Sequence, residues 1–277
     1  MLDALLPYRF SPLITVVFGL VLVVWLSGFV RRRDARAGEA AAFLTGLGLC
    51  YVVLHTRFDY YAQYMFFMHR LQHLVLHHLG AFLIALAAPW GTLAAGTPAP
   101  VRRLLAPILL HPLVLAGYRF LQHPVTAPIL FVGLIYFWLQ PELHFDAMLD
   151  LDLYHLMNWT MLLDGLLFWW LILDPRDPAT SAAPAFGTRL VMLFGIMPPQ
   201  IVLGAWIALS GTEIYDVYDV CGRAWPLAPE VDQQIGGLLT WIPAAMMSVL
   251  GVIAVLVRMR RARRAADDAD PDLEPAP

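Results

Sequence analysis

Long apolar segments constrain this chain more than any other feature of its sequence. Seven segments qualify as membrane spans, at about residues 10–30, 38–56, 63–88, 124–141, 152–173, 190–210 and 235–257. Each has roughly the 20 residues that a helix needs to cross about 30 Å of hydrocarbon. They are too continuous for the alternating pattern of a membrane β-barrel. The sequence therefore predicts an all-α fold, a polytopic membrane bundle of seven transmembrane helices.

The composition supports a membrane protein. The chain is 60% hydrophobic and 14% charged, whereas a soluble domain carries about a quarter charged residues. One arginine, Arg9, precedes the first segment and the cluster 31–33 follows it, which is typical of a retained span rather than a cleaved signal. Cys50 and Cys221 show no paired spacing and imply no disulfide framework. We expect the lipid bilayer to surround the chain, and no nucleic-acid partner.

An eighth apolar stretch, within residues 102–122, is a weaker candidate. The residues between Arg103 and Arg119 are few for a span, and Pro107 and Pro112 interrupt them. Because proline breaks a helix interior, we expect an in-plane or re-entrant helix here. A span at these residues stays an open alternative.

The arginines predict how the spans are oriented. With seven spans and the N-terminus outside, fourteen of the eighteen arginines lie on the cytoplasmic side. Only Arg9, Arg57 and Arg223 lie outside, and Arg70 lies within a span. The positive-inside rule therefore favours an outer N-terminus and a cytoplasmic C-terminus. We expect residues 258–277, which are basic and then acidic, to be a disordered cytoplasmic tail.

Four of the nine histidines fall within ten residues of the third span. On a helix, Met65, His69, His73 and His77 share one stripe at i+4 spacing, with Met68 beside it. Two histidines at this spacing can bind one metal ion. Ionisable groups in a bilayer are costly and mark functional sites by default. The His69–His73 pair is therefore the first candidate for a metal site.

Other soft ligands are expected at the same membrane face. His144 follows the fourth span and His155 opens the fifth. Histidine and methionine together suit copper, especially Cu(I). Asp164 and Asn158 lie on the fifth span, where they can balance charge or orient an imidazole. The plainer alternative is that these histidines and methionines only pack and form hydrogen bonds between helices.

Four short stretches carry a resemblance to a known family. They are Met68-His69-Arg70-Leu71-Gln72-His73-Leu74 leading to Ala87-Ala88-Pro89, then His123-Pro124, then Gly165-Leu166-Leu167-Phe168-Trp169-Trp170, and finally Asp232-Gln233-Gln234-Ile235-Gly236-Gly237 with Trp241-Ile242-Pro243. In this order they resemble the multi-pass CtaG family of cytochrome c oxidase assembly factors, over residues 40–257. The extra histidines His77 and His78 depart from the family pattern.

The resemblance implies a seven-span protein of the bacterial inner (plasma) membrane that is not an enzyme. It implies a role in building haem–copper oxidase, by handling copper on the outer face. The implied partners are oxidase subunits and other copper chaperones. The implied site residues are His69, His73, His155, Asp232, Gln233 and Gln234. A cap on the last helix is the alternative role for Asp232.

Three other functions stay open at this point. The spacing of His69, His73 and His77–His78 resembles the histidine boxes of a membrane di-iron oxygenase or desaturase, although those enzymes need separated boxes. Paired histidines on facing helices, such as His73 and His155, can ligate haem. A scaffold that binds an oxidase subunit without any metal is the third alternative.

Overall fold

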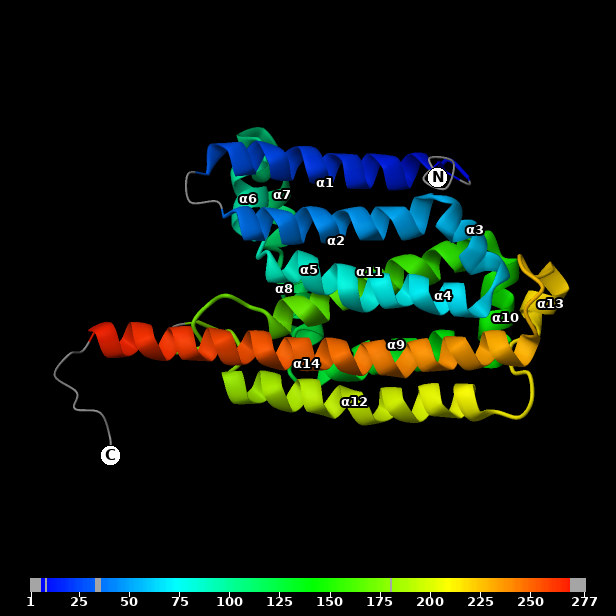
Figure 1. Cartoon of the computed structure of the whole chain (residues 1–277). Helices are drawn as coiled ribbons and strands as arrows, with labels where there is room; N and C mark the ends of the chain where they lie inside the picture. Colours follow the sequence, from blue (N-terminus) through cyan, green and yellow to red (C-terminus); the bar gives the residue numbers. More distant parts are fainter. Residues whose placement is uncertain (1–5, 8, 33–35, 180, 270–277) are drawn as a thin grey trace, which may run out of the picture.

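A computed structural model of the chain describes residues 6–7, 9–32, 36–179 and 181–269. Within these ranges every regular element is a helix. The long helices lie side by side along one axis (Figure 1). They are α1 (Pro12–Arg31), α2 (Ala37–His55), α4 (Phe66–His73) continued by the π-helix η2 (Leu74–Leu79) and α5 (Gly80–Leu86), α9 (Thr126–Trp138), α11 (Leu151–Ile172), α12 (Phe186–Leu209) and α14 (Pro229–Ala269). The all-α helix bundle is confirmed.

Length and composition allow four to seven spans in the described residues. The helices α1, α2, α12 and α14 are each long and apolar enough to cross a membrane, and three bent pairs raise the number to seven if each pair is one span. One bent pair is α9 with α10 (Pro141–Leu149), which turns by 72°. The 22-residue α11 is outside this set, because polar residues such as Asn158 and Asp164 lower its mean hydropathy.

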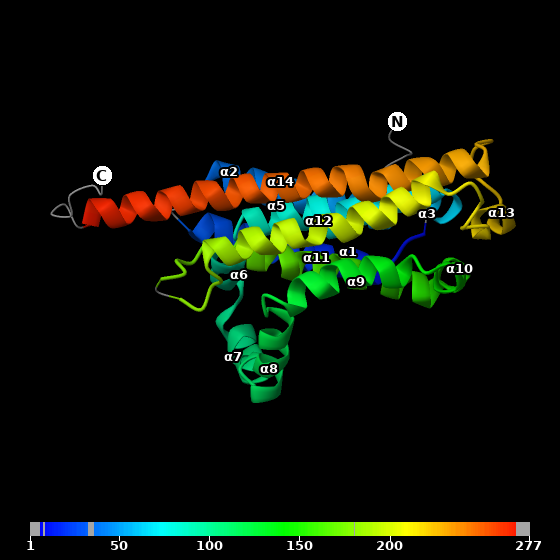
Figure 2. The same ribbon diagram turned by 90° about the horizontal axis from the view of Figure 1, so that it is seen from below.

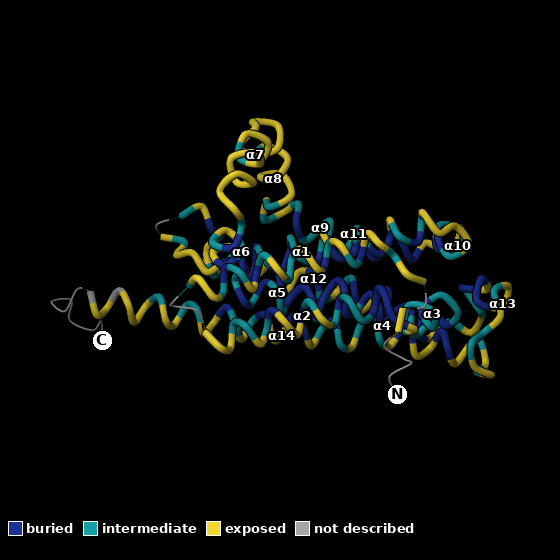
Figure 3. The backbone as a smooth tube through the Cα atoms, turned by 90° about the horizontal axis from the view of Figure 1, so that it is seen from above, coloured by how far each residue is buried: buried dark blue, intermediate teal, exposed yellow. Residues whose placement is uncertain are grey.

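The stretch at residues 102–122 forms two short helices, α7 (Ala99–Leu109) and α8 (Pro112–Leu121). The chain bends by 77° between them, where Pro112 begins α8. This α7–α8 hairpin projects sideways from the bundle (Figures 2 and 3), and none of its residues is buried. It lies across the bundle direction, as expected of an in-plane or re-entrant segment.

Close helix crossings depend on glycine. The short helix α6 (Trp90–Gly96) packs against α1. A Cβ atom added at Gly28 would lie 1.8 Å from the carbonyl oxygen of Thr92. No other residue allows the two backbones to approach this closely.

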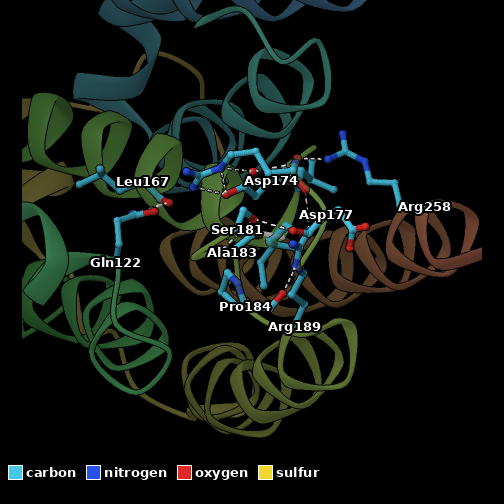
Figure 4. Close-up of polar contacts among 12 residues, drawn as sticks. Gln122, Leu167, Asp174, Asp177, Ser181, Ala183, Pro184, Arg189 and Arg258 are labelled. Carbon is cyan, nitrogen blue, oxygen red and sulfur yellow. Dashed lines mark hydrogen bonds and ion pairs between the residues drawn. The ribbon is translucent and has the colours of Figure 1, made fainter. Parts of the chain in front are cut away.

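The two ends of the bundle differ in character. At one end lie the short helices α3 (Arg57–Tyr64), α10 and α13 (Val217–Cys221), and we call it the α13 end (Figure 1). At the opposite end, the arginine end, two buried or part-buried arginines hold the C-terminus of α11 (Figure 4). Arg189 donates to the carbonyl oxygens of Ile172 and Asp174, and Arg258 donates to that of Leu173. Positive charges stabilise the C-terminus of a helix, so these bonds hold the C-terminal end of α11 in place.

The third predicted span differs in detail, and the prediction for the C-terminal segment is wrong. The span predicted at about residues 63–88 is helical from Phe66 to Leu86, but extended backbone at Met65 (φ −143°) separates α3 from α4, and a π-helix follows His73. The segment 258–269 is helical rather than disordered, since α14 continues to Ala269 (Figure 1). Arginine and alanine are strong helix formers, and they dominate this stretch. Residues 270–277 lie outside the described part of the chain.

Candidate functional site

Three imidazoles meet inside the bundle near the α13 end, and we call them the imidazole cluster: His69, His73 and His144. The ring centroids of His69 and His73 are 4.2 Å apart, and those of His69 and His144 are 5.1 Å apart. All three side chains are buried. The i+4 spacing on α4 therefore brings the predicted pair together, and α10 adds His144.

The start of α4 is fixed by a residue far away in the sequence. Both carboxylate oxygens of Asp232, at the start of α14, accept from α4: the backbone N–H groups of Phe66 and Phe67 donate at 3.0 and 2.8 Å. Arg223 forms an ion pair with the same carboxylate. Asp232 thus caps α4 and not α14, so the alternative of a cap on the last helix is wrong. By fixing the start of α4, Asp232 also fixes the position of His69 along the bundle axis.

The neighbours of His73 and His144 occupy their ring nitrogens. His144 Nδ1 lies 3.0 Å from the carbonyl oxygen of Trp138, so this nitrogen donates, and Nε2 accepts from the Tyr218 hydroxyl at 3.0 Å. His73 Nε2 lies 3.1 Å from the Asn158 Oδ1 atom, and Nδ1 lies 3.3 Å from a guanidinium nitrogen of Arg70. The lone pairs of both rings therefore already face donors.

His69 differs from the other two members of the cluster. Neither of its ring nitrogens has a hydrogen-bond partner, although the side chain is fully buried. A buried polar group without a partner costs about 1–3 kcal/mol. His69 is thus the one imidazole in the cluster whose lone pair is free to bind something.

A buried arginine stands beside the cluster. The Arg70 Nε atom donates to the Thr240 hydroxyl at 2.9 Å. Among the described residues no carboxylate pairs with this guanidinium. Its charge acts on all five buried histidines of the third span and α10. The site therefore carries one fixed positive charge before any ligand arrives.

His77 and His78 form a second pair, nearer the arginine end. They lie on the π-helix, which turns them away from the stripe that an α-helix would give. His77 Nε2 is 3.0 Å from the Asp164 carboxylate, and the His77 ring stacks on Phe131 with centroids 3.9 Å apart. Neither ring nitrogen of His78 has a hydrogen-bond partner. Asp164 thus serves this lower pair and not the imidazole cluster.

Other predicted ligands lie outside the cluster. His155 is half-buried. Its neighbour Tyr154 is the residue that lies next to His69, with their ring centroids 6.2 Å apart. Met65 is buried at the break before α4, and Met68 is half-buried one residue, or about 100° of helix, from His69.

Gln233 and Gln234 do not reach the cluster either. Gln233 bonds to the backbone of Ile214, Ile207 and Thr212, and so anchors the loop before α13. Gln234 is exposed.

The sequence did not predict a polar network next to the cluster, formed by Asp59, Gln72 and Tyr154. The Tyr154 hydroxyl lies 2.8 Å from Asp59 and 3.0 Å from Gln72, and Gln72 Nε2 donates to Asp59 at 3.0 Å. Burial raises the pKa of the Asp59 carboxyl, against the donors that lower it. The available signal was Gln72, a polar residue inside the third apolar segment.

The described residues contain no group of three or more His, Cys, Asp and Glu side chains that is arranged to hold a metal ion. The donor type nevertheless fits copper, since the His69 imidazole, which has no hydrogen-bond partner, offers one lone-pair nitrogen beside His73. For His73 to contribute as well, it would have to exchange its contact with Arg70 or with Asn158 for the metal. The arrangement therefore fits an exchangeable site of low coordination number rather than a closed cage.

Comparison with known proteins places the chain in a family. It is 28% identical to an uncharacterized protein of Mycobacterium leprae over 92% of this chain, and 29% identical to an uncharacterized protein of Mycobacterium bovis over 95%. The chain spans only 40% and 41% of the length of these relatives. No solved structure matches it. The model of the family described as cytochrome c oxidase caa3 assembly factor (Caa3_CtaG) matches residues 21–262, and the chain belongs to this family.

Proposed function

We propose that this protein supports cytochrome c oxidase assembly by taking up a copper ion, Cu(I), as cargo at the imidazole cluster and passing it to an oxidase subunit. The observation that carries the proposal is His69, fully buried with both ring nitrogens free and flanked by His73 and His144. Imidazole nitrogen is a common copper ligand. The family role in oxidase assembly supplies the recipient.

The position of the cluster supports delivery at the outer face. The helix α4, which carries His69 and His73, lies toward the α13 end, whereas the ends of α1 and α14 that carry Arg31 and Arg258 lie toward the other end (Figure 1). Under the positive-inside rule the arginine end is cytoplasmic and the α13 end is outside. We propose that the protein lies in the bacterial plasma membrane with its N-terminus outside and its C-terminus in the cytoplasm.

The surroundings of the cluster favour release over storage. Arg70 places a positive charge next to His73, and a metal cation bound there would feel its repulsion. Binding that is weakened in this way suits transfer to another protein. No chemical step is needed, so we propose a non-enzymatic role.

Metal analysis of the purified protein tests this proposal. Protein prepared under reducing conditions should carry about one copper per chain, as expected for a single imidazole-based site, and no iron or haem. The double variant His69→Ala with His73→Ala should lose the copper. The matched control is His111→Ala with His123→Ala, since these two histidines are exposed near the α7–α8 hairpin. Equal copper in the two double variants would refute the site.

Oxidase assembly in cells tests the competing scaffold function. If the protein only holds an oxidase subunit, the His69/His73 double variant should still support full oxidase activity. Under the copper proposal, oxidase in such cells should accumulate with less copper than in the His111/His123 control.

A further inference from the structure

A carboxyl group faces the side of the bundle at the level of the second histidine pair. One oxygen of Asp164 lies 3.0 Å from His77 Nε2, and the other has no hydrogen-bond partner among the described residues. The side chain is 16% exposed. An ionisable side chain in a membrane helix is costly and normally has a functional partner. His77 satisfies only half of this carboxyl group.

Asp164 is one of the residues that line a groove of about 480 Å³ between α9 and α11. Apart from Asp164 and Thr160, the lining is apolar or glycine. The groove opens onto the surface that lipid would cover, because Ile129, Phe137 and Leu163 on its walls are 63%, 51% and 55% exposed. A Cβ atom added at Gly133 would have no other atom within 4 Å. The groove is therefore open along α9, and a neighbouring backbone can approach it closely.

The α7–α8 hairpin borders this groove. Leu121, the last residue of α8, lines it beside Leu167 of α11. The Gln122 side chain donates to the Leu167 carbonyl oxygen at 2.9 Å, which ties the hairpin to α11 (Figure 4). The hairpin projects from the same side of the bundle, and none of its residues is buried (Figures 2 and 3). Groove and hairpin together form one face that no other part of the described chain covers.

The chemistry of this face selects its occupant. An acyl chain would fill the apolar walls but cannot donate to the carboxyl oxygen. A transmembrane helix with a hydrogen-bond donor at this depth satisfies both, and small residues such as Gly133 are typical of contacts between membrane helices. From Ile129 to Phe137 the wall extends about 12 Å, or two turns of helix.

We propose that the groove between α9 and α11 docks a transmembrane helix of an oxidase subunit, with Asp164 accepting from a donor on that helix. This inference rests on the assembly role of the proposed function and not on copper. In this proposal the unpaired carboxyl oxygen of Asp164 recognises the partner helix, while His77 binds the second oxygen.

Photocrosslinking in native membranes tests the docking. Benzoylphenylalanine replaces Phe137 on the groove wall, or Leu20 on the exposed face of α1 as the control. Crosslinked oxidase subunits are identified by mass spectrometry. We expect crosslinks to a membrane subunit of the oxidase from position 137 and not from position 20. Labelling of lipid alone, or equal labelling from both positions, would overturn the proposal.

Groove variants then test the residues. Asp164→Leu removes the acceptor, and Asp164→Asn keeps an acceptor oxygen. Because a hydrogen bond between membrane helices is modest, Asp164→Leu should lower the crosslink yield about threefold to thirtyfold, and Asp164→Asn should largely retain it. Gly133→Leu fills the groove and leaves the pair with His77 intact, so it should lower the yield even if Asp164→Leu fails to fold. Its control is Gly195→Leu on α12, which also adds a side chain into open space.

Unchanged yields in both Asp164→Leu and Gly133→Leu would refute docking in this groove. Copper separates this result from the first proposal. The His69/His73 double variant should lose copper and still crosslink, whereas the groove variants should keep copper and lose the crosslink. Either proposal can therefore fail while the other stands.

Discussion

The charge of Arg70 sets a measurable limit on how tightly the imidazole cluster can hold a cation. We consider Arg70→Gln, because glutamine keeps a donor for Thr240 and removes the positive charge. The guanidinium lies 3.3 Å from His73 Nδ1. A cation on the far side of that ring is about 7 Å from the guanidinium, so at an effective dielectric constant of about 20 the two unit charges repel by about 2.4 kcal/mol.

Removing this repulsion should tighten Cu(I) binding by about 50-fold, since 1.4 kcal/mol corresponds to a tenfold change in affinity. The assay is competition of the purified protein against a chromophoric Cu(I) chelator under reducing conditions. Arg189→Gln is the matched control, because Arg189 is also buried but lies at the arginine end. Its copper affinity should match that of the unchanged protein.

An unchanged or weaker Cu(I) affinity in Arg70→Gln would refute the reasoning. It would mean either that copper binds away from His73 or that Arg70 supports the site structurally. Measuring the thermal unfolding of the variant separates these two readings, because a structural role would also lower its stability.

Three further predictions concern stability and pH. Gly165→Ala would place a Cβ atom 2.5 Å from the His77 carbonyl oxygen, so it should lower the unfolding free energy by about 1–3 kcal/mol, while Gly195→Ala should not. Asp232→Ala removes the cap from α4 and should cost about 1–2 kcal/mol in the same unfolding assay. Burial raises the pKa of Asp59, so the folded state binds its proton more tightly and stability should fall as pH rises above the ordinary value of 3.8; Asp59→Asn should remove that fall.

The apolar segments predicted the bundle because hydrocarbon imposes a length that can be counted along a sequence. The same reasoning failed where the backbone departs from the α-helix. The stripe from Met65 to His77 assumed one regular helix, but the chain is extended at Met65 and the π-helix begins at Leu74. One additional residue in a turn moves every later side chain by about 100°, which is why His69 and His73 meet and His77 does not join them.

Contacts between distant residues were beyond the sequence. Asp232 caps α4 across more than 160 residues, and no local pattern announces such a bond. His155 and Tyr154 differ by one position on α11, and only the packing of that helix decides that the tyrosine faces His69. The pairing of Asp164 with His77 likewise depends on how α11 crosses the π-helix at Gly165.

The two histidine groups and the arginine between them bear on the direction of any copper transfer. Arg70, His73 and His78 line one cavity of about 10 Å³, which has room for about one water molecule. Arg70 therefore lies where a cation would pass from the imidazole cluster to the lower pair. A fixed positive charge at that point opposes such passage, and His69, whose ring has no hydrogen-bond partner, is not among the residues that line this cavity. Under the proposed function, copper taken up by His69 is released at the membrane face from which it came, which is the behaviour of a delivery protein and not of a transporter.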